Sequence, residues 1–160
     1  MTEAAFLRET IAVPIDRSIF GLDEERSAEE PDRPYWVDLP MDGEPVRVSQ
    51  SAVRVMSTVE SHDATVTIEV RRGPQLDAAP GFELLGQWHY RTVGGEIGLY
   101  NIDGPLFSFT LNPKSEYTLR VWRKGGDTAT EKHAALVGNV YPIEGLEEYM
   151  IELSGVSSTD

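Results

Sequence analysis

The chain has 160 residues, enough for one globular domain with a sizeable core. Its 27 acidic residues outnumber its 14 basic ones, which gives a formal net charge of -13. A field of that sign repels phosphate backbones, so it argues against nucleic-acid binding and favours basic partners, although solubility alone also explains it. There is no cysteine, so the sequence predicts neither a disulfide framework nor thiol chemistry.

The sequence contains no pattern typical of a signal peptide or of a membrane-spanning helix. Residues 1–10 begin with acidic character and contain no apolar stretch of the kind that a signal peptide needs. No apolar run approaches the roughly 20 residues of a membrane helix. The sequence therefore predicts a cytoplasmic protein without a membrane partner.

The N-terminal third alternates short apolar segments with a charged one. Thr10–Ile15 alternates and contains Pro14, which is typical of an edge strand, and Ser18–Leu22 is a second apolar segment. Asp23–Pro34 is rich in charge and contains two prolines, so it is predicted to be a mobile, solvated loop. Tyr35–Leu39 is predicted to be a strand that leads into a turn.

The middle of the chain has the clearest strand patterns. In Thr65–Val70, the residues Val66, Ile68 and Val70 are predicted to face inward, because side chains alternate between the two faces of a strand. Further strands are predicted at Ala52–Met56, Phe82–Tyr90 (with a bulge at Gly86), Glu96–Ile102 and Leu106–Leu111.

The C-terminal third continues in the same way. Tyr117–Lys124 alternates and ends at a glycine pair, and Glu147–Leu153 forms the last predicted strand. Between them, Ala129–Val137 is predicted to be a short helix, and residues 154–160 to be a flexible tail. About nine strands with short turns and little helix predict an all-β protein, a single antiparallel β-sandwich spanning residues 1–160 as one domain.

Motifs for catalysis, metals and cofactors do not occur in this sequence. His62, His89 and His133 have none of the spacings of a metal-binding pair, and the acids of Asp23–Asp32 lack the spacing and the glycine of a calcium loop. There is no Gly-x-Ser-x-Gly elbow and no phosphate-binding glycine loop. The sequence therefore predicts no catalytic residue, no metal and no cofactor.

Two sets of residues remain as candidates for binding. The first is the acidic part of the charged loop, which would present an exposed negative surface to a basic partner: Asp23, Glu24, Glu25, Glu29 and Glu30. The second is a pocket lined by neighbouring aromatic and imidazole side chains, Trp88, His89 and Tyr90.

The order of these segments resembles a known group of proteins. The resemblance rests on Ile11–Leu22, Val66–Val70, Gly95–Leu99, Tyr117–Val121 and Glu148–Leu153. In these segments the chain resembles bacterial, largely actinobacterial, β-sandwich proteins, which are in turn similar to the competence-protein J family. The name-giving member of that family inhibits a DNA-entry nuclease, so the resemblance implies a β-sandwich and an inhibitor role.

The leading hypothesis is a non-enzymatic, acidic binding or inhibitor protein directed against a basic nuclease or toxin. Its physical logic is mimicry of nucleic-acid charge, with electrostatically steered association. The alternative is a small-molecule-binding or hydrolytic domain that uses the pocket at Trp88, His89 and Tyr90. A third hypothesis is an accessory subunit without an active site. The sequence leaves the partner and the oligomeric state open.

Overall fold

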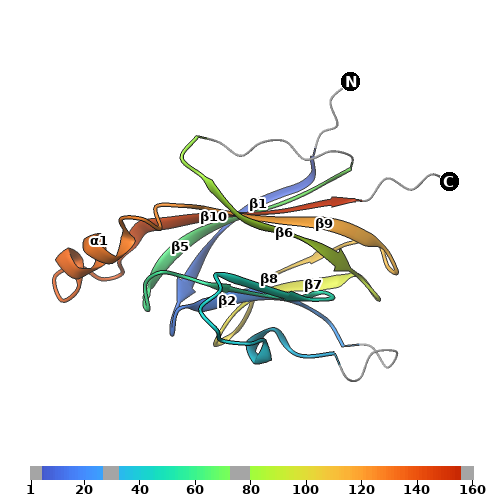
Figure 1. Ribbon diagram of the computed structural model, residues 1–160, viewed down its shortest axis with the longest axis horizontal. Helices are drawn as coiled ribbons and strands as arrows, with labels where there is room; N and C mark the ends of the chain where they lie inside the picture. The colour runs from blue at the N-terminus through green and yellow to red at the C-terminus, as the bar shows by residue number, and fades with distance from the viewer. Residues whose placement is uncertain (1–4, 27–32, 73–79, 156–160) are drawn as a thin grey trace.

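Alternating apolar residues build two five-stranded β-sheets in the computed structural model, which describes residues 5–26, 33–72 and 80–155 (Figure 1). Sheet A has the order β1 (Ala5–Ile15), β5 (His62–Arg72), β10 (Glu144–Gly155), β9 (Glu116–Lys124) and β6 (Glu83–Arg91). Sheet B has the order β3 (Val46–Ser49), β4 (Ala52–Met56), β2 (Ile19–Glu24), β7 (Glu96–Asn101) and β8 (Gly104–Thr110). The mostly-β class predicted from the sequence is confirmed.

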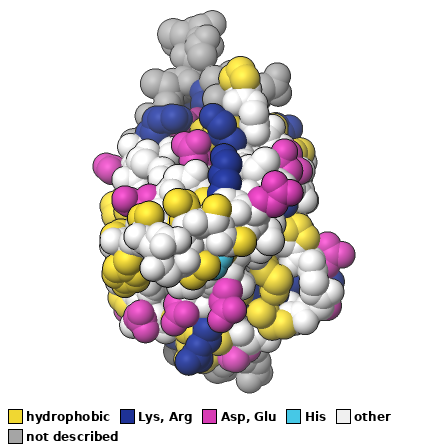
Figure 2. All heavy atoms as spheres, turned by 90° about the vertical axis from the view of Figure 1, so that its left-hand side faces the viewer, with side chains coloured by type: hydrophobic (Ala, Val, Ile, Leu, Met, Phe, Trp, Pro, Cys, Tyr) yellow, Lys and Arg dark blue, Asp and Glu magenta, His cyan; other side chains and the backbone are white. Residues whose placement is uncertain are grey.

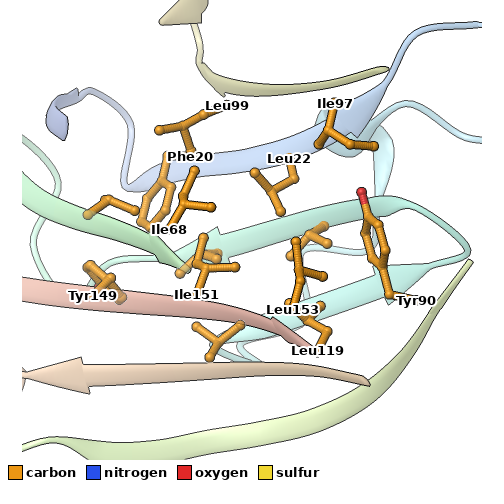
Figure 3. Packing of buried hydrophobic residues seen from close by; sticks show 14 of the residues in the cluster. Phe20, Leu22, Ile68, Tyr90, Ile97, Leu99, Leu119, Tyr149, Ile151 and Leu153 are labelled. Carbon is orange, nitrogen blue, oxygen red and sulfur yellow. The ribbon is translucent and has the colours of Figure 1, made fainter. Parts of the chain in front are cut away.

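One apolar cluster joins the two sheets (Figure 3). Phe20 and Leu99 come from sheet B, Ile68 and Ile151 come from sheet A, and all four are fully buried. Each such side chain stabilises the fold by about 1.5–3 kcal/mol through the apolar surface that it removes from water. The inward-facing set predicted in Thr65–Val70 is confirmed by this cluster.

Sheet A is not purely antiparallel. β10 lies between β5 and β9, and it pairs with β9 in antiparallel and with β5 in parallel orientation. The expectation of a single antiparallel arrangement is therefore wrong for the centre of sheet A. Alternation within a strand says which residues face the core, but it carries no information on which strand lies alongside. The described residues form ten strands, and β3 is the one that the sequence pattern missed.

The segment predicted as a strand at Tyr35–Leu39 is instead a single 3-10 turn, η1 (Trp36–Asp38). Trp36 and Leu39 are both buried and pack together on the outer face of sheet B. Residues three apart share a face in a 3-10 turn but lie on opposite faces of a strand, so the turn is the conformation that buries both.

A short helix, α1 (Ala129–Leu136), stands at one end of the molecule, beside the start of β10 (Figure 1). It lies within the segment predicted to be helical. β10 continues to Gly155, so residues 154 and 155 belong to the strand and not to the predicted tail, and residues 156–160 lie outside the described part. No helix in the described residues is long and apolar enough to span a membrane.

Candidate functional site

The end of the molecule that carries α1 is hollowed by a groove of about 800 Å³, which we call the α1 groove. Its walls include the β1–β2 connection at Asp16, the β4–β5 connection at Glu60, the β7–β8 connection at Asp103 and the segment 137–143 between α1 and β10. Figure 2 shows this end of the molecule, with hydrophobic side chains in two groups, a histidine between them and acidic side chains below.

Among the described residues that line the α1 groove are four carboxylates, Asp16, Glu60, Asp63 and Asp103, and two histidines, His62 and His133, but no lysine or arginine. Asp63 is half-buried and the other three are exposed. Such a wall is complementary to a lysine or arginine side chain of a partner. In the part of the chain that the structure describes, no group of three or more His, Cys, Asp or Glu side chains is arranged to hold a metal ion.

The rim of the α1 groove is apolar and exposed. Val137 is 53% exposed, Val140 is 46% exposed and Tyr141 is 97% exposed. None of the three belongs to a core cluster, so their exposure serves no packing purpose within the described fold. An exposed aromatic side chain beside a charged hollow is the arrangement that protein interfaces use for their strongest contacts.

The rim is held in place by a small apolar cluster of its own. Val59, Ala129, Ile143 and Leu146 are buried together beneath α1, apart from the main core. The backbone N–H of Asp63 donates to the carbonyl of Ile143 at 2.7 Å, which ties the segment after α1 to the start of β5. The rim is therefore presented by ordered backbone, which reduces the entropy cost of binding.

A buried polar network lies below the α1 groove and includes one of its lining residues, His62. The Glu147 carboxylate accepts hydrogen bonds from the hydroxyls of Ser57 at 2.6 Å and Tyr149 at 2.7 Å, and from the backbone N–H of Thr58 at 3.2 Å. The Nε2 atom of His62 lies 2.8 Å from the Ser57 hydroxyl. Burial raises the pKa of Glu147, but the hydrogen bonds from His62, Ser57, Thr58 and Tyr149 outweigh it and lower that pKa to about 2.

Ser57, His62 and Glu147 are the residue types of a hydrolytic triad, but their geometry is that of a structural network. In a triad the carboxylate holds the imidazole, and the imidazole accepts the serine proton. Here Ser57 donates its only proton to Glu147, so it accepts from His62, whose Nε2 then carries a proton and cannot act as the base. All three side chains are also buried. The network therefore joins the end of β4 to β10.

No protein-family model and no curated protein matches the chain. Two solved structures are similar over nearly the whole fold. The first is ComJ from Bacillus subtilis, an inhibitor of the DNA-degrading activity of NucA, with a TM-score of 0.57 and 14% identity, covering 98% of this chain and all of ComJ. The second is the crocagin biosynthetic gene J protein, with a TM-score of 0.51 and 13% identity, covering 98% of this chain and all of that protein. The resemblance to the competence-protein J family is supported at the level of the fold.

The first predicted binding set lies only in part where the sequence pattern placed it. Asp23 and Glu24 are not in an exposed loop but in β2, and they are buried. Asp23 pairs with the Arg33 guanidinium at 2.6 Å. Glu24 accepts from the Ser51 hydroxyl at 2.8 Å and from the backbone N–H of Gly95 at 2.7 Å. The expectation of exposure is therefore wrong for these two, because their carboxylates bind groups inside the fold.

The rest of that set remains a prediction. Glu25 lies just beyond β2 and is exposed. Glu29 and Glu30 belong to residues 27–32, which lie outside the described part of the chain, as does that portion of the predicted mobile loop. Among the described members of the set, Asp23 and Glu24 are thus buried inside the fold, and Glu25 is exposed.

Trp88, His89 and Tyr90 do not line one pocket. Trp88 and Tyr90 lie on the core side of β6, where Tyr90 is fully buried and Trp88 is packed against the main cluster. His89 is on the other face, where its imidazole contacts the exposed carboxylate of Glu116. Burial raises the pKa of the Tyr90 hydroxyl. Successive residues of a strand point to opposite faces, so this alternative site is wrong.

The residues of the α1 groove escaped the sequence analysis because they are scattered. Asp16, Glu60 and Asp103 lie in three separate turns, and only the fold brings them to one end of the molecule. The single local signal was Val140-Tyr-Pro142, an apolar pair followed by proline with no alternation on either side. The residues on either side of this segment are too polar for a strand in the core. In the structure the segment forms part of the rim of the α1 groove.

Proposed function

We propose that this protein is an acidic binding protein of the inhibitor type, which takes a basic surface of a partner protein, such as a nuclease or toxin, into the α1 groove. The observation that carries the proposal is the lining of the groove, where the described residues include four carboxylates and no lysine or arginine, and the rim is exposed and apolar. In this role the two sheets form a β-sandwich, and the protein acts in the bacterial cytoplasm.

The carboxylates of the groove and its apolar rim contribute to binding in different ways. The carboxylates of Asp16, Glu60 and Asp103 raise the association rate and exclude acidic partners, since long-range attraction acts before contact. The side chain of Tyr141 supplies the apolar area that slows dissociation. Glu25, which is exposed and does not line the groove, adds to the attraction, and Glu29 and Glu30 contribute to the negative net charge of the chain.

The structural likeness supports a binding protein more than an enzyme. ComJ is described as an inhibitor of a nuclease, and it shares this fold along its full length. At 14% identity the likeness extends to the fold, so the partner of this chain is inferred from the groove and not carried over from ComJ. The buried Ser57, whose proton is engaged by Glu147, gives no support to the hydrolytic alternative.

The proposal is tested by kinetics with a matched pair of variants. The groove variant is Asp16→Asn, Glu60→Gln, Asp103→Asn. The control variant, Asp38→Asn, Glu96→Gln, Asp127→Asn, makes the same change in net charge at exposed positions that do not line the groove. Association rates, affinities and inhibition of activity are measured at two salt concentrations against the nucleases and toxins encoded beside the gene.

We expect the groove variant to lose at least about tenfold in affinity and most of its salt dependence, because close charge pairs contribute more than distant ones. The control variant is expected to lose no more than about threefold. Equal losses in the two variants would assign the effect to net charge alone. Absence of binding to every neighbouring nuclease and toxin would contradict the inhibitor proposal itself.

A further inference from the structure

The carboxylates of the α1 groove have no cation beside them. Elsewhere in the fold an acidic side chain pairs with an arginine even at an exposed position, as Asp42 does with Arg47. Within residues 5–26, 33–72 and 80–155, the groove carboxylates neither form a salt bridge nor accept a hydrogen bond: Asp16, Glu60, Asp63 and Asp103. The negative charge of the groove is therefore available to a cation from outside the chain.

Asp63 is the least exposed of these four side chains, since it is half-buried and the others are exposed. Removing an ionised carboxylate from water is costly unless a cation compensates for the lost hydration. The backbone N–H of Asp63 donates to the carbonyl of Ile143, which follows the exposed Tyr141 by two residues. An unpaired, half-buried carboxylate and an exposed aromatic ring are thus held on neighbouring segments of the same groove.

His62 adds an unsatisfied acceptor to the groove lining. Its side chain is fully buried, and in the described part of the chain its Nδ1 atom has no hydrogen-bond partner. Nε2 carries a proton toward the Ser57 hydroxyl, so Nδ1 of the neutral imidazole is an acceptor. A buried acceptor without a donor is unfavourable, which adds to the demand for a donor-rich ligand at this end of the molecule.

The chain shows elsewhere how it holds an arginine between a tyrosine and a carboxylate. The guanidinium carbon of Arg26 lies 3.6 Å from the centre of the Tyr35 ring, and one of its nitrogens lies 3.8 Å from the Asp23 carboxylate. The ring attracts the flat face of the cation, and the carboxylate attracts its charge. The α1 groove has a tyrosine and carboxylates in its lining but no arginine among its described residues.

We propose that the α1 groove receives one arginine side chain of the partner protein, with its guanidinium stacked on the ring of Tyr141 and bonded to the carboxylate of Asp63. The carboxylates of Asp16, Glu60 and Asp103 compensate its charge at the mouth of the groove. This inference rests on the proposed function and adds to it the residue that the partner must present.

The combination of a ring, apolar side chains and carboxylates favours arginine over lysine. A guanidinium is planar and weakly hydrated, so it stacks on a ring while its N–H groups bond carboxylate oxygens at its edge. An ammonium is compact and strongly hydrated, and it loses more hydration when it contacts an apolar surface. The exposed side chains of Val137 and Val140 suit the methylene stem that arginine carries behind its charged group.

The test uses blocked amino acids as probes of the full chain. N-acetyl-L-arginine amide, the corresponding lysine compound and the uncharged citrulline compound are titrated while backbone amide shifts are followed by NMR. The variants are Tyr141→Leu, Tyr141→Phe and Asp63→Asn. The matched control is Glu144→Gln, which changes an exposed carboxylate that lies opposite Asp63 in the ladder of β5 and β10 but does not line the groove. Unchanged dispersion of the amide spectrum verifies that each variant is folded.

We expect the arginine probe to bind the wild type with a dissociation constant on the order of 1 mM and to shift the amides of His62, Asp63 and Tyr141. The lysine probe should bind at least about threefold more weakly, and the citrulline probe at least about tenfold more weakly. Tyr141→Leu and Asp63→Asn should each lose at least about threefold in affinity for arginine. Tyr141→Phe and Glu144→Gln should bind as the wild type does.

Equal binding of the three probes, or binding that neither Tyr141→Leu nor Asp63→Asn weakens, would overturn the inference. Tighter binding of free L-arginine than of its blocked form would overturn it as well, by assigning the groove to a free amino acid. A partner whose affinity falls in the groove variant but survives replacement of each of its own arginines by lysine would refute the arginine contact and leave the proposed function standing. Absence of any partner would refute the proposed function, whatever the probes do.

Discussion

At the scale of single residues, the fold depends on carboxylates that bind inside the molecule. Asp23 accepts from the Arg33 guanidinium and from the backbone N–H of Trp36, and both charged side chains are at most 5% exposed. Glu24 holds the turn at Val93 and Gly95 through their N–H groups. These contacts join segments that are far apart in the sequence. Asp23 and Glu24 therefore have a structural role inside the fold, although composition alone would place them on the surface.

Replacing Arg33 with Ala should destabilise the protein by about 3 kcal/mol, because the buried Asp23 carboxylate loses its close cation and keeps only the Arg26 guanidinium at 3.8 Å. The measurement is urea-induced unfolding followed by fluorescence. Arg47→Ala is the control, since the pair of Arg47 with Asp42 is exposed and should contribute nothing measurable. Equal unfolding midpoints for the two variants would contradict the assignment.

Glu147 gives a prediction in acid. Its folded pKa of about 2 lies below the ordinary value of 4.5, so its contribution is complete above pH 4.5 and is lost as the pH falls through about 2. That difference corresponds to about 3 kcal/mol of stability. Unfolding free energies across this range should show the loss in the wild type and in Glu148→Gln, whose mutated side chain is exposed. Glu147→Gln should flatten the slope, and an unchanged slope would contradict this role.

At the scale of elements, alternation predicted most of the strands. Thr65–Val70 and Tyr117–Lys124 were found because each keeps one face in the core, which is the physical origin of the period. The bulge predicted at Gly86 is confirmed by the register shift in β6. The two-residue period gave the wrong prediction at η1, where the buried residues Trp36 and Leu39 are three positions apart. It also missed β3, which is too short to show a period.

Adjacent glycines before β7 allow a matched test of one turn. Gly95 has a φ of 90°, and an added Cβ would lie 2.2 Å from the carbonyl oxygen of Leu111. Gly95→Ala should therefore cost at least about 1–3 kcal/mol. Gly94→Ala should change stability by less, because a Cβ there meets nothing within 4 Å. Thermal unfolding of both variants checks this, and similar midpoints would show that the turn adapts.

At the scale of the whole molecule, the pattern of charge was readable from the sequence but its location was not. Composition alone gives the net charge of -13. The α1 groove needs the tertiary structure, because Asp16, Glu60 and Asp103 meet only when the turns of both sheets are stacked at one end. The same holds for the exposure of Tyr141, which is a property of the fold around it.

Repulsion between the many exposed carboxylates lowers the stability of the folded protein. Salt screens exposed charges beyond about 8 Å at physiological ionic strength, so adding sodium chloride should raise the unfolding midpoint. The groove variant Asp16→Asn, Glu60→Gln, Asp103→Asn should respond less steeply, because part of the repulsion is already removed. Differential scanning fluorimetry across a salt series measures both. A midpoint that falls with salt would mean that attractive surface pairs dominate.

The position of β10 has a consequence for how the chain is made. β10 follows the other nine strands in the sequence, yet it lies in the middle of sheet A, and its Tyr149, Ile151 and Leu153 are buried in the main cluster. A ribosome releases both β5 and β9 before the strand that must lie between them, and β5 leaves it well before β9. During synthesis the chain therefore has two half-sheets with open inner edges, the state in which chaperones and aggregation compete for nascent β proteins.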